Sequence, residues 1–106
     1  MAWAVLIVAG ALEVVWAFAM KQSQGFSRLG PSLVTVAAML ASFALLSWSM
    51  RSLPLGTAYT VWTGIGAVGA FIAGIVFLGE SASALRLVAA ALIVGGLVLM
   101  KIASPA

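Results

Sequence analysis

The sequence contains no cysteine and no histidine, and only two of its 106 residues are acidic. Without cysteine the chain forms no disulfides and carries no thiol nucleophile, and without either residue type the usual zinc and haem ligands are missing. Two carboxylates are too few to build a carboxylate metal cage within one chain. The composition therefore argues against an enzyme, and it predicts neither a metal site nor a cofactor.

Positive charge is also sparse, with five basic residues in the whole chain. They are scattered singly at Lys21, Arg28, Arg51, Arg86 and Lys101. No cluster is present that could hold a nucleic acid. Each basic residue lies at or near the edge of an apolar run, where its side chain can reach lipid headgroups. We interpret them as helix-end anchors and expect no nucleic-acid partner.

Apolar residues fill most of what remains, with 65% hydrophobic and 7% charged residues. A soluble domain of this length leaves too much surface in water to hide such a composition. A run of about 20 apolar residues spans the hydrocarbon core of a bilayer. The sequence predicts an all-α integral membrane protein, a single domain over residues 1–106 with no separate soluble part. The expected transmembrane helices are residues 2–20, 31–50, 57–78 and 85–102.

Glu13 interrupts the first of these runs. A carboxylate at the centre of the bilayer costs ~2.5 kcal/mol or more, so such residues usually face a partner, a cavity or a transport pathway. Residues 17–19 resemble a signal-peptidase site, but no Lys or Arg precedes the run and Glu13 breaks its hydrophobic region, so we expect a retained helix. The other acidic residue, Glu80, lies in the turn before the fourth run and is interpreted as a solvated loop carboxylate.

The loop charges are almost evenly divided between the two faces of the membrane. Lys21, Arg28 and Arg86 lie on one face, while Arg51, Lys101 and the N-terminal amine lie on the other. Orientation in the membrane is set by a Lys/Arg bias between the faces. Because this chain has almost no bias, we hypothesise that it inserts in both orientations.

Small residues mark the third and fourth runs. Gly64, Gly66 and Gly69 spell G-x-G-x-x-G, but the dinucleotide fingerprint requires a strand before it and a soluble βαβ unit, so this match is accidental. A glycine cluster can bend a helix, and we expect these three residues to form a hinge. Gly95 and Gly96 give the fourth run a surface for close helix packing in lipid, which predicts a contact between subunits.

Aromatic residues accompany the carboxylate. Trp16 lies three residues after Glu13 on the same helix face, and Tyr59 and Trp62 are spaced in the same way on the third run. The spacing alone fits either an interfacial aromatic belt or a cation site. A carboxylate flanked by aromatic faces suits a desolvated cation, and the same carboxyl can instead hold a proton. One group that binds either a proton or a cation is the minimum chemistry of an antiporter.

Four helices enclose too little volume for a solvated pathway. A dimer would supply two copies of Glu13, and two opposite orientations of one sequence would provide the inverted symmetry that many transporters obtain from internal repeats. No internal repeat is visible in this chain. The predicted partner is therefore a second copy of the chain, in an antiparallel homodimer of dual topology.

Three segments carry a family resemblance that covers essentially the whole chain. They are EVVWA at 13–17, KQSQGFSR at 21–28 and PLGTAYTVWTGIG at 54–66. In this order the chain resembles the small multidrug resistance family, and within it the guanidinium-exporter branch. One departure is that Ala89 stands where the family often has the first of two glycines spaced seven residues apart, with Gly96 as the second.

The resemblance implies an antiparallel homodimer of the inner (plasma) membrane that exports guanidinium in exchange for protons by alternating access. It places the essential carboxylate at Glu13, which would bind both proton and substrate, and it implies that Trp16, Ser42, Tyr59 and Trp62 line the site. The multidrug branch typically has a small residue in place of Trp16, which favours guanidinium over bulky cations.

Other functions remain open from the sequence. A polyspecific exporter of quaternary ammonium and lipophilic cations is the alternative within the family. A rotor-type proteolipid would also pair a membrane carboxylate with glycine-rich helices, but it gives the aromatic residues no role. A non-transporting assembly factor would need a basic partner helix from another protein, because no basic residue lies deep in any of the four runs.

Overall fold

The computed structural model describes residues 1–104 of the chain. It consists of four α-helices, α1 (Ala2–Gln22), α2 (Leu29–Ser49), α3 (Leu55–Leu78) and α4 (Ala84–Ala103). All four are long and apolar enough to cross a membrane. At about 1.5 Å per residue, a 20-residue helix spans about 30 Å, the thickness of the hydrocarbon core. The predicted all-α membrane class is confirmed, and each helix end differs from its predicted limit by at most two residues.

Local signals in the sequence account for the ends of the helices. The first turn of α2 contains Pro31, where the missing N–H leaves no bond unmade. α3 ends at Gly79, whose φ of 67° is the left-handed conformation that glycine adopts without strain. Ser83 caps α4, since its hydroxyl oxygen accepts a hydrogen bond from the Arg86 backbone N–H at 3.4 Å.

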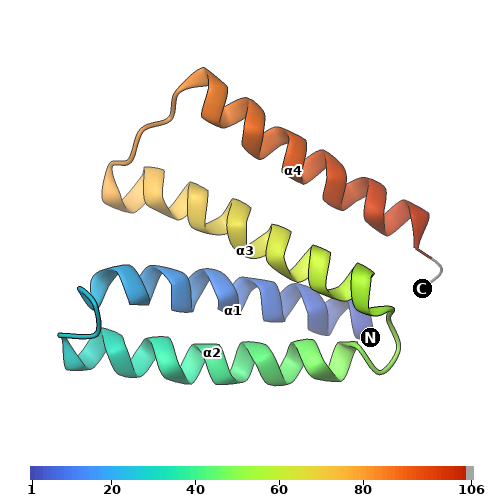
Figure 1. Cartoon of the computed structure of the whole chain (residues 1–106), viewed down its shortest axis with the longest axis horizontal. Helices are drawn as coiled ribbons and strands as arrows, with labels where there is room; N and C mark the ends of the chain where they lie inside the picture. Colours follow the sequence, from blue (N-terminus) through green and yellow to red (C-terminus); the bar gives the residue numbers. More distant parts are fainter. Residues whose placement is uncertain (105–106) are drawn as a thin grey trace.

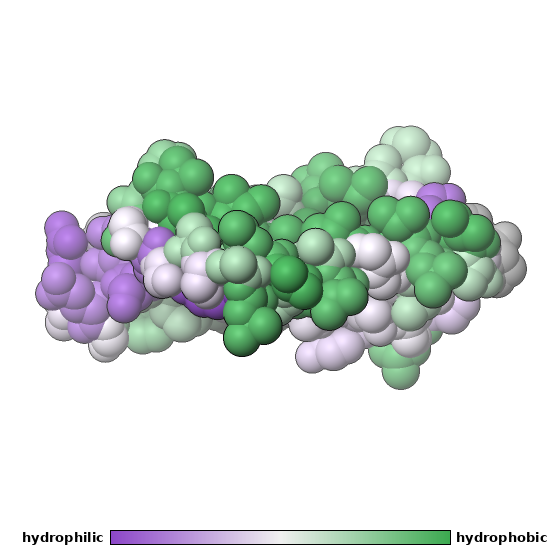
Figure 2. Space-filling model, turned by 90° about the horizontal axis from the view of Figure 1, so that it is seen from above, coloured by the Kyte–Doolittle hydropathy of each residue, from purple (hydrophilic) through white to green (hydrophobic). Residues whose placement is uncertain are grey.

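Figure 1 shows how the helices are arranged. α1 packs against both α2 and α3, whereas α4 packs mainly along α3 within residues 1–104. α4 lies closest to α3 near the C-terminal end and diverges from it toward the loop that joins them (Figure 1). Both termini lie at the same end of the molecule, as four crossings require. In Figure 2, hydrophobic residues cover the middle of the visible face, and hydrophilic residues gather at the end that carries the α1–α2 and α3–α4 loops.

The buried core lies where α1 meets α2 and α3. It comprises Leu6, Ala9, Leu46, Leu53, Ala58, Val61 and Trp62. Close approach of α1 to α3 depends on glycine, since a Cβ at Gly10 would lie 2.7 Å from the Ile65 side chain. No residue of α4 is buried. The fold therefore fixes α1 at the centre and leaves one helix with nearly all of its surface uncovered.

The C-terminal end of α4 is tied to the rest of the chain by two polar contacts. The Lys101 ammonium lies 4.6 Å from the centre of the Trp3 ring on α1, a cation–π contact. The Thr57 and Ser104 hydroxyls are 3.2 Å apart and share a hydrogen bond across α3 and α4. Lys101 thus lies near the end of α4 with an aromatic ring as its partner, and its role as a lipid anchor stays a prediction.

Candidate functional site

Glu13 lies in the middle of α1, and its side chain packs directly against the backbone of α3. The contact is made at Gly66, where an added Cβ would collide with the Oε1 and Cδ atoms of Glu13 and would lie 2.7 Å from its Cγ. The Oε1 atom is buried and has no hydrogen-bond partner within residues 1–104. A buried carboxylate oxygen without a donor is costly in any environment and more so in lipid.

Trp16 lies one turn further along α1. Its indole Nε1 is also buried and finds no acceptor within the described part of the chain. Its ring packs edge-on against Phe43 of α2, with ring centres 6.4 Å apart and planes at 75°. One acceptor and one donor on the same face of α1 are therefore left without partners. Such a pair is suited to a ligand or a partner chain that supplies both a donor and an acceptor.

Ser42 is fully buried on α2 and joins three helices through its hydroxyl group. The hydroxyl donates to the Ala9 carbonyl of α1 at 2.7 Å and accepts from the Trp62 indole N–H of α3 at 2.9 Å. No hydrogen bond joins Ser42 to Glu13 in residues 1–104. Within one chain, the Ser42 hydroxyl therefore contacts α1 at Ala9 and the Trp62 indole of α3.

A row of aromatic rings connects the site residues of the three helices. Phe43 contacts both Trp16 and Trp62, with its ring centre 5.8 Å from that of Trp62, and the Tyr59 ring lies 5.6 Å from the Trp62 ring. Trp62 is 6% exposed and Tyr59 is 53% exposed, so the row runs from the core to the surface of the chain. The structure thus brings together Trp16, Ser42, Tyr59 and Trp62, the set that the family resemblance implied.

The sequence did not predict Phe43 as a member of this aromatic row. A phenylalanine in a membrane helix normally faces lipid, so Phe43 does not stand out from the other apolar residues of its run. Its only distinguishing feature in the sequence is its position next to Ser42. Its ring is 45% exposed and closes the space between two tryptophans that are far apart in the sequence.

The comparisons with known proteins decide the family. The profile of the Small Multidrug Resistance protein family matches residues 1–93. The chain belongs to the small multidrug resistance family. This confirms the resemblance drawn from its three sequence segments.

Relatives within the small multidrug resistance family match almost from end to end. A protein of Citrobacter freundii named "Guanidinium exporter" is 60% identical over 104 residues, covering 98% of this chain and 99% of the relative. A protein of the same name from Escherichia coli (strain K12) is 61% identical over the same shares of the two chains. The similarity therefore extends over almost the whole length of both chains.

The three glycines predicted as a hinge lie within an unbroken α3. Each is close to a different side chain: a Cβ would collide with Leu97 at Gly64, with Glu13 at Gly66 and with Val14 at Gly69. In this conformation they allow neighbouring helices to approach α3. Their role as a hinge stays a prediction.

The two glycines predicted at a subunit contact have a different environment. A Cβ at Gly95 or Gly96 would meet no atom within 4 Å. Gly96 lines a groove of about 530 Å³ between α3 and α4, together with Tyr59 and Thr63. This surface of the small multidrug resistance fold is uncovered in a single chain.

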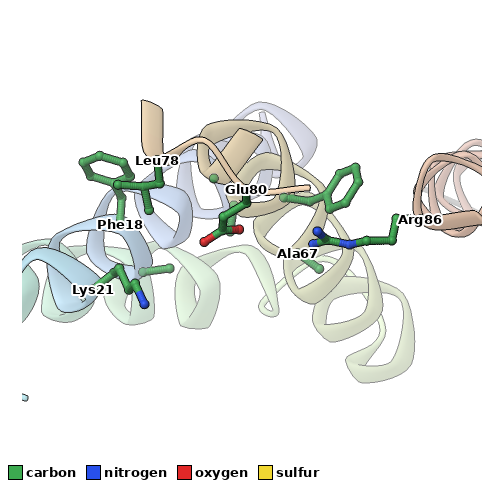
Figure 3. A pocket seen from close by; sticks show the side chains of 10 residues that line it. Phe18, Lys21, Ala67, Leu78, Glu80 and Arg86 are labelled. Atoms are coloured by element: carbon green, nitrogen blue, oxygen red, sulfur yellow. The ribbon is translucent and has the colours of Figure 1, made fainter. Parts of the chain in front are cut away.

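Glu80 is exposed, as predicted, but it points into a pocket of about 320 Å³ where α1, α3 and the start of α4 meet (Figure 3). Its carboxylate rests on Gly74 and lies between Lys21 and Arg86 (Figure 3). The Arg86 guanidinium lies 4.9 Å from the centre of the Phe71 ring and donates to the Ser81 carbonyl at 2.5 Å. Two positive charges and one negative charge line this pocket. This lining carries a net positive charge, which disfavours a small cation.

Proposed function

We propose that this protein exports guanidinium across the inner (plasma) membrane in exchange for protons. The main support is the position of the Glu13 carboxylate in the middle of a membrane helix. One of its oxygens is buried and has no hydrogen-bond donor within residues 1–104. The chain is 60% identical over nearly its full length to a protein named for guanidinium export. The small multidrug resistance fold and the buried carboxylate support the same function.

The chemistry of the site suits a planar cation with several N–H donors. Guanidinium pairs with a carboxylate through two parallel hydrogen bonds, which are stronger than neutral ones. Aromatic faces such as those of Trp16 and Trp62 attract a desolvated cation by a further 0.5–2 kcal/mol or so. A protonated Glu13 presents no charge to guanidinium, so proton and substrate exclude each other from the carboxyl. Exchange follows when the emptied site takes up a proton before it reopens to the other side.

The partner that completes the pathway is a second copy of the chain, in antiparallel orientation. α4 has no buried residue, and Gly95 and Gly96 face open space, so a large apolar surface is free for a subunit contact. The balanced loop charges support insertion in both orientations. A dimer places two Glu13 carboxylates in one pathway, enough for bidentate pairing with substrate or for two protons.

Export of bulky quaternary ammonium ions is the alternative function within the family. Trp16 argues against it, because a bulky indole ring, packed edge-on against Phe43, stands one turn from Glu13 where the multidrug branch typically has a small residue. Quaternary ammonium ions also carry no N–H donor for a carboxylate. The two functions are separated by measuring whether such ions compete with guanidinium for transport.

Reconstitution in liposomes tests the proposal. A guanidinium gradient is applied across vesicles that contain a pH-sensitive dye, and we expect guanidinium entry to alkalinise the lumen as protons leave. Glu13→Gln keeps the shape of the side chain and should abolish this signal. Glu80→Gln is the matched control, since it neutralises the only other acidic residue, and it should retain the signal. A wild-type protein that moves guanidinium without moving protons, or an active Glu13→Gln variant, would exclude the exchange.

The absence of native cysteine allows a direct test of topology. Ser52 lies exposed in the turn between α2 and α3, and Ser52→Cys introduces a single thiol. In whole cells, a membrane-impermeant thiol reagent should label about half of the protein if the two orientations are equally populated. Complete labelling, or none until the cells are lysed, would establish a single orientation.

A further inference from the structure

Each glycine of the G-x-G-x-x-G segment receives a different neighbour. Leu97 lies against Gly64 and Val14 lies against Gly69, and both of these neighbours are apolar. Gly66 alone receives a charged group, the carboxyl end of Glu13. The three positions are thus not equivalent, although the sequence presents them as one cluster.

The contact at Gly66 involves the whole end of the Glu13 side chain. An added Cβ would overlap with Oε1 and Cδ and would lie 2.7 Å from Cγ, closer than carbon atoms approach without displacement. Oε1 has no hydrogen-bond partner within residues 1–104, so inside one chain no donor fixes this oxygen, and it lies against the bare backbone of α3 at Gly66. Gly66 also lies one turn beyond Trp62, whose ring is held by Ser42. The carboxylate therefore lies against α3 one helical turn from Trp62, a member of the aromatic row.

We infer that Gly66 is a positioning residue for Glu13: its missing side chain forms the seat that places the carboxylate where proton and guanidinium compete for it. This inference rests on the proposed exchange function and adds to it. A methyl group at position 66 displaces the carboxylate, whereas a methyl group elsewhere in the same helix interface displaces only hydrocarbon.

Gly10 provides the matched control. It lies on α1 one turn before Glu13, and a Cβ there would lie 2.7 Å from Cγ2 and 2.8 Å from Cβ of Ile65, the residue next to Gly66. Gly10→Ala and Gly66→Ala therefore both insert one methyl group between α1 and α3. Only Gly66→Ala inserts it against the carboxylate.

The experiment measures guanidinium binding to the purified full-length protein by calorimetry, as a function of pH. We expect Gly66→Ala to weaken binding about tenfold or more, the effect of losing one charge-assisted hydrogen bond, and to shift the pH midpoint at which protons displace guanidinium. Gly10→Ala should change the thermal stability but neither the binding constant nor the midpoint. Equal effects of the two substitutions on binding and midpoint would overturn the inference.

A second variant tests the inference even if Gly66→Ala does not yield a stably folded protein. Glu13→Ala/Gly66→Ala removes the side chain with which the new methyl group collides, so the double variant should recover the stability that Gly66→Ala loses. If the double variant is as unstable as Gly66→Ala, the seat does not exist. This comparison needs no substrate. It therefore separates failure of the seat from failure of the exchange function, which would appear as a wild-type protein that does not bind guanidinium.

Discussion

Replacing Ser42 by alanine removes the hydroxyl that joins three helices. The Ala9 carbonyl keeps its hydrogen bond within α1, but the Trp62 indole N–H loses its acceptor while its ring stays 6% exposed. We expect the substitution to destabilise each chain, and to do so because a buried donor is left without a partner.

The magnitude follows from the number and kind of bonds lost. Hydrogen bonds between helices in a membrane contribute about 0.6 kcal/mol each on average, so two of them contribute about 1.2 kcal/mol. An orphaned buried N–H costs about 1–3 kcal/mol when it finds no water or other acceptor. We therefore expect a loss of about 1–3 kcal/mol in the free energy of unfolding per chain, together with weaker guanidinium binding as the Trp62 ring loses its orientation.

Ser49 is the matched control on the same helix. It is also fully buried, but its hydroxyl donates only to the Leu46 carbonyl of its own helix, at 2.7 Å. That carbonyl also accepts from the Met50 N–H at 3.1 Å, so Ser49→Ala leaves no group without a partner. The expected loss is about 0.5 kcal/mol or less.

Equilibrium unfolding in mixed detergent micelles, with increasing dodecyl sulfate, measures both variants. Equal losses for Ser42→Ala and Ser49→Ala would refute the reasoning. A double-mutant cycle with Trp62→Phe, which removes the indole N–H but retains a ring, gives a second test. Ser42→Ala should cost clearly less in the Trp62→Phe background, and strict additivity would show that the two side chains do not interact.

Three further predictions concern the proposed transport site and the proposed dimer. Trp16→Ala opens space beside Glu13, so we expect competition by quaternary ammonium ions that is absent in the wild type, measured as inhibition of guanidinium uptake. Lowering the pH on the substrate side should raise the half-saturating guanidinium concentration without lowering the maximal rate, because a protonated carboxyl cannot pair with guanidinium. The increase should reach up to about tenfold per pH unit for each proton exchanged. Flux measurements at several pH values test this, and a change in the maximal rate alone would contradict it. Gly96→Leu fills the uncovered surface of α4, and cross-linking should show loss of the dimer with helical content unchanged by circular dichroism.

The membrane-spanning helices could be predicted from the sequence because lipid acts on each segment separately. A run of twenty residues without charge crosses the bilayer whatever its neighbours are, and the turns between the runs are marked by glycine, proline and basic residues. The importance of Glu13 follows from the same reasoning. A carboxylate in such a segment is costly wherever the other helices lie.

The positions of the other site residues could be named only through the family resemblance. Trp16, Tyr59 and Trp62 fitted an interfacial belt as well as a cation site, because spacing along one helix does not say what lies across from it. The ring that links them, Phe43, carried no signal. Helices that are apolar on every side do not show in their sequence which face meets a neighbour.

The sequence by itself thus showed that the chain lies in lipid, that it crosses the membrane four times and that Glu13 is a costly charge within a membrane helix. Each of these conclusions depends only on the composition of a single segment. The tertiary structure decided which helices meet and at which rotation. It directed the Ser42 hydroxyl to Ala9 and Trp62, divided the three glycines of α3 among different neighbours, and set the carboxylate of Glu13 on Gly66. Each of those contacts joins residues on two different helices, so it exists only when the helices have packed.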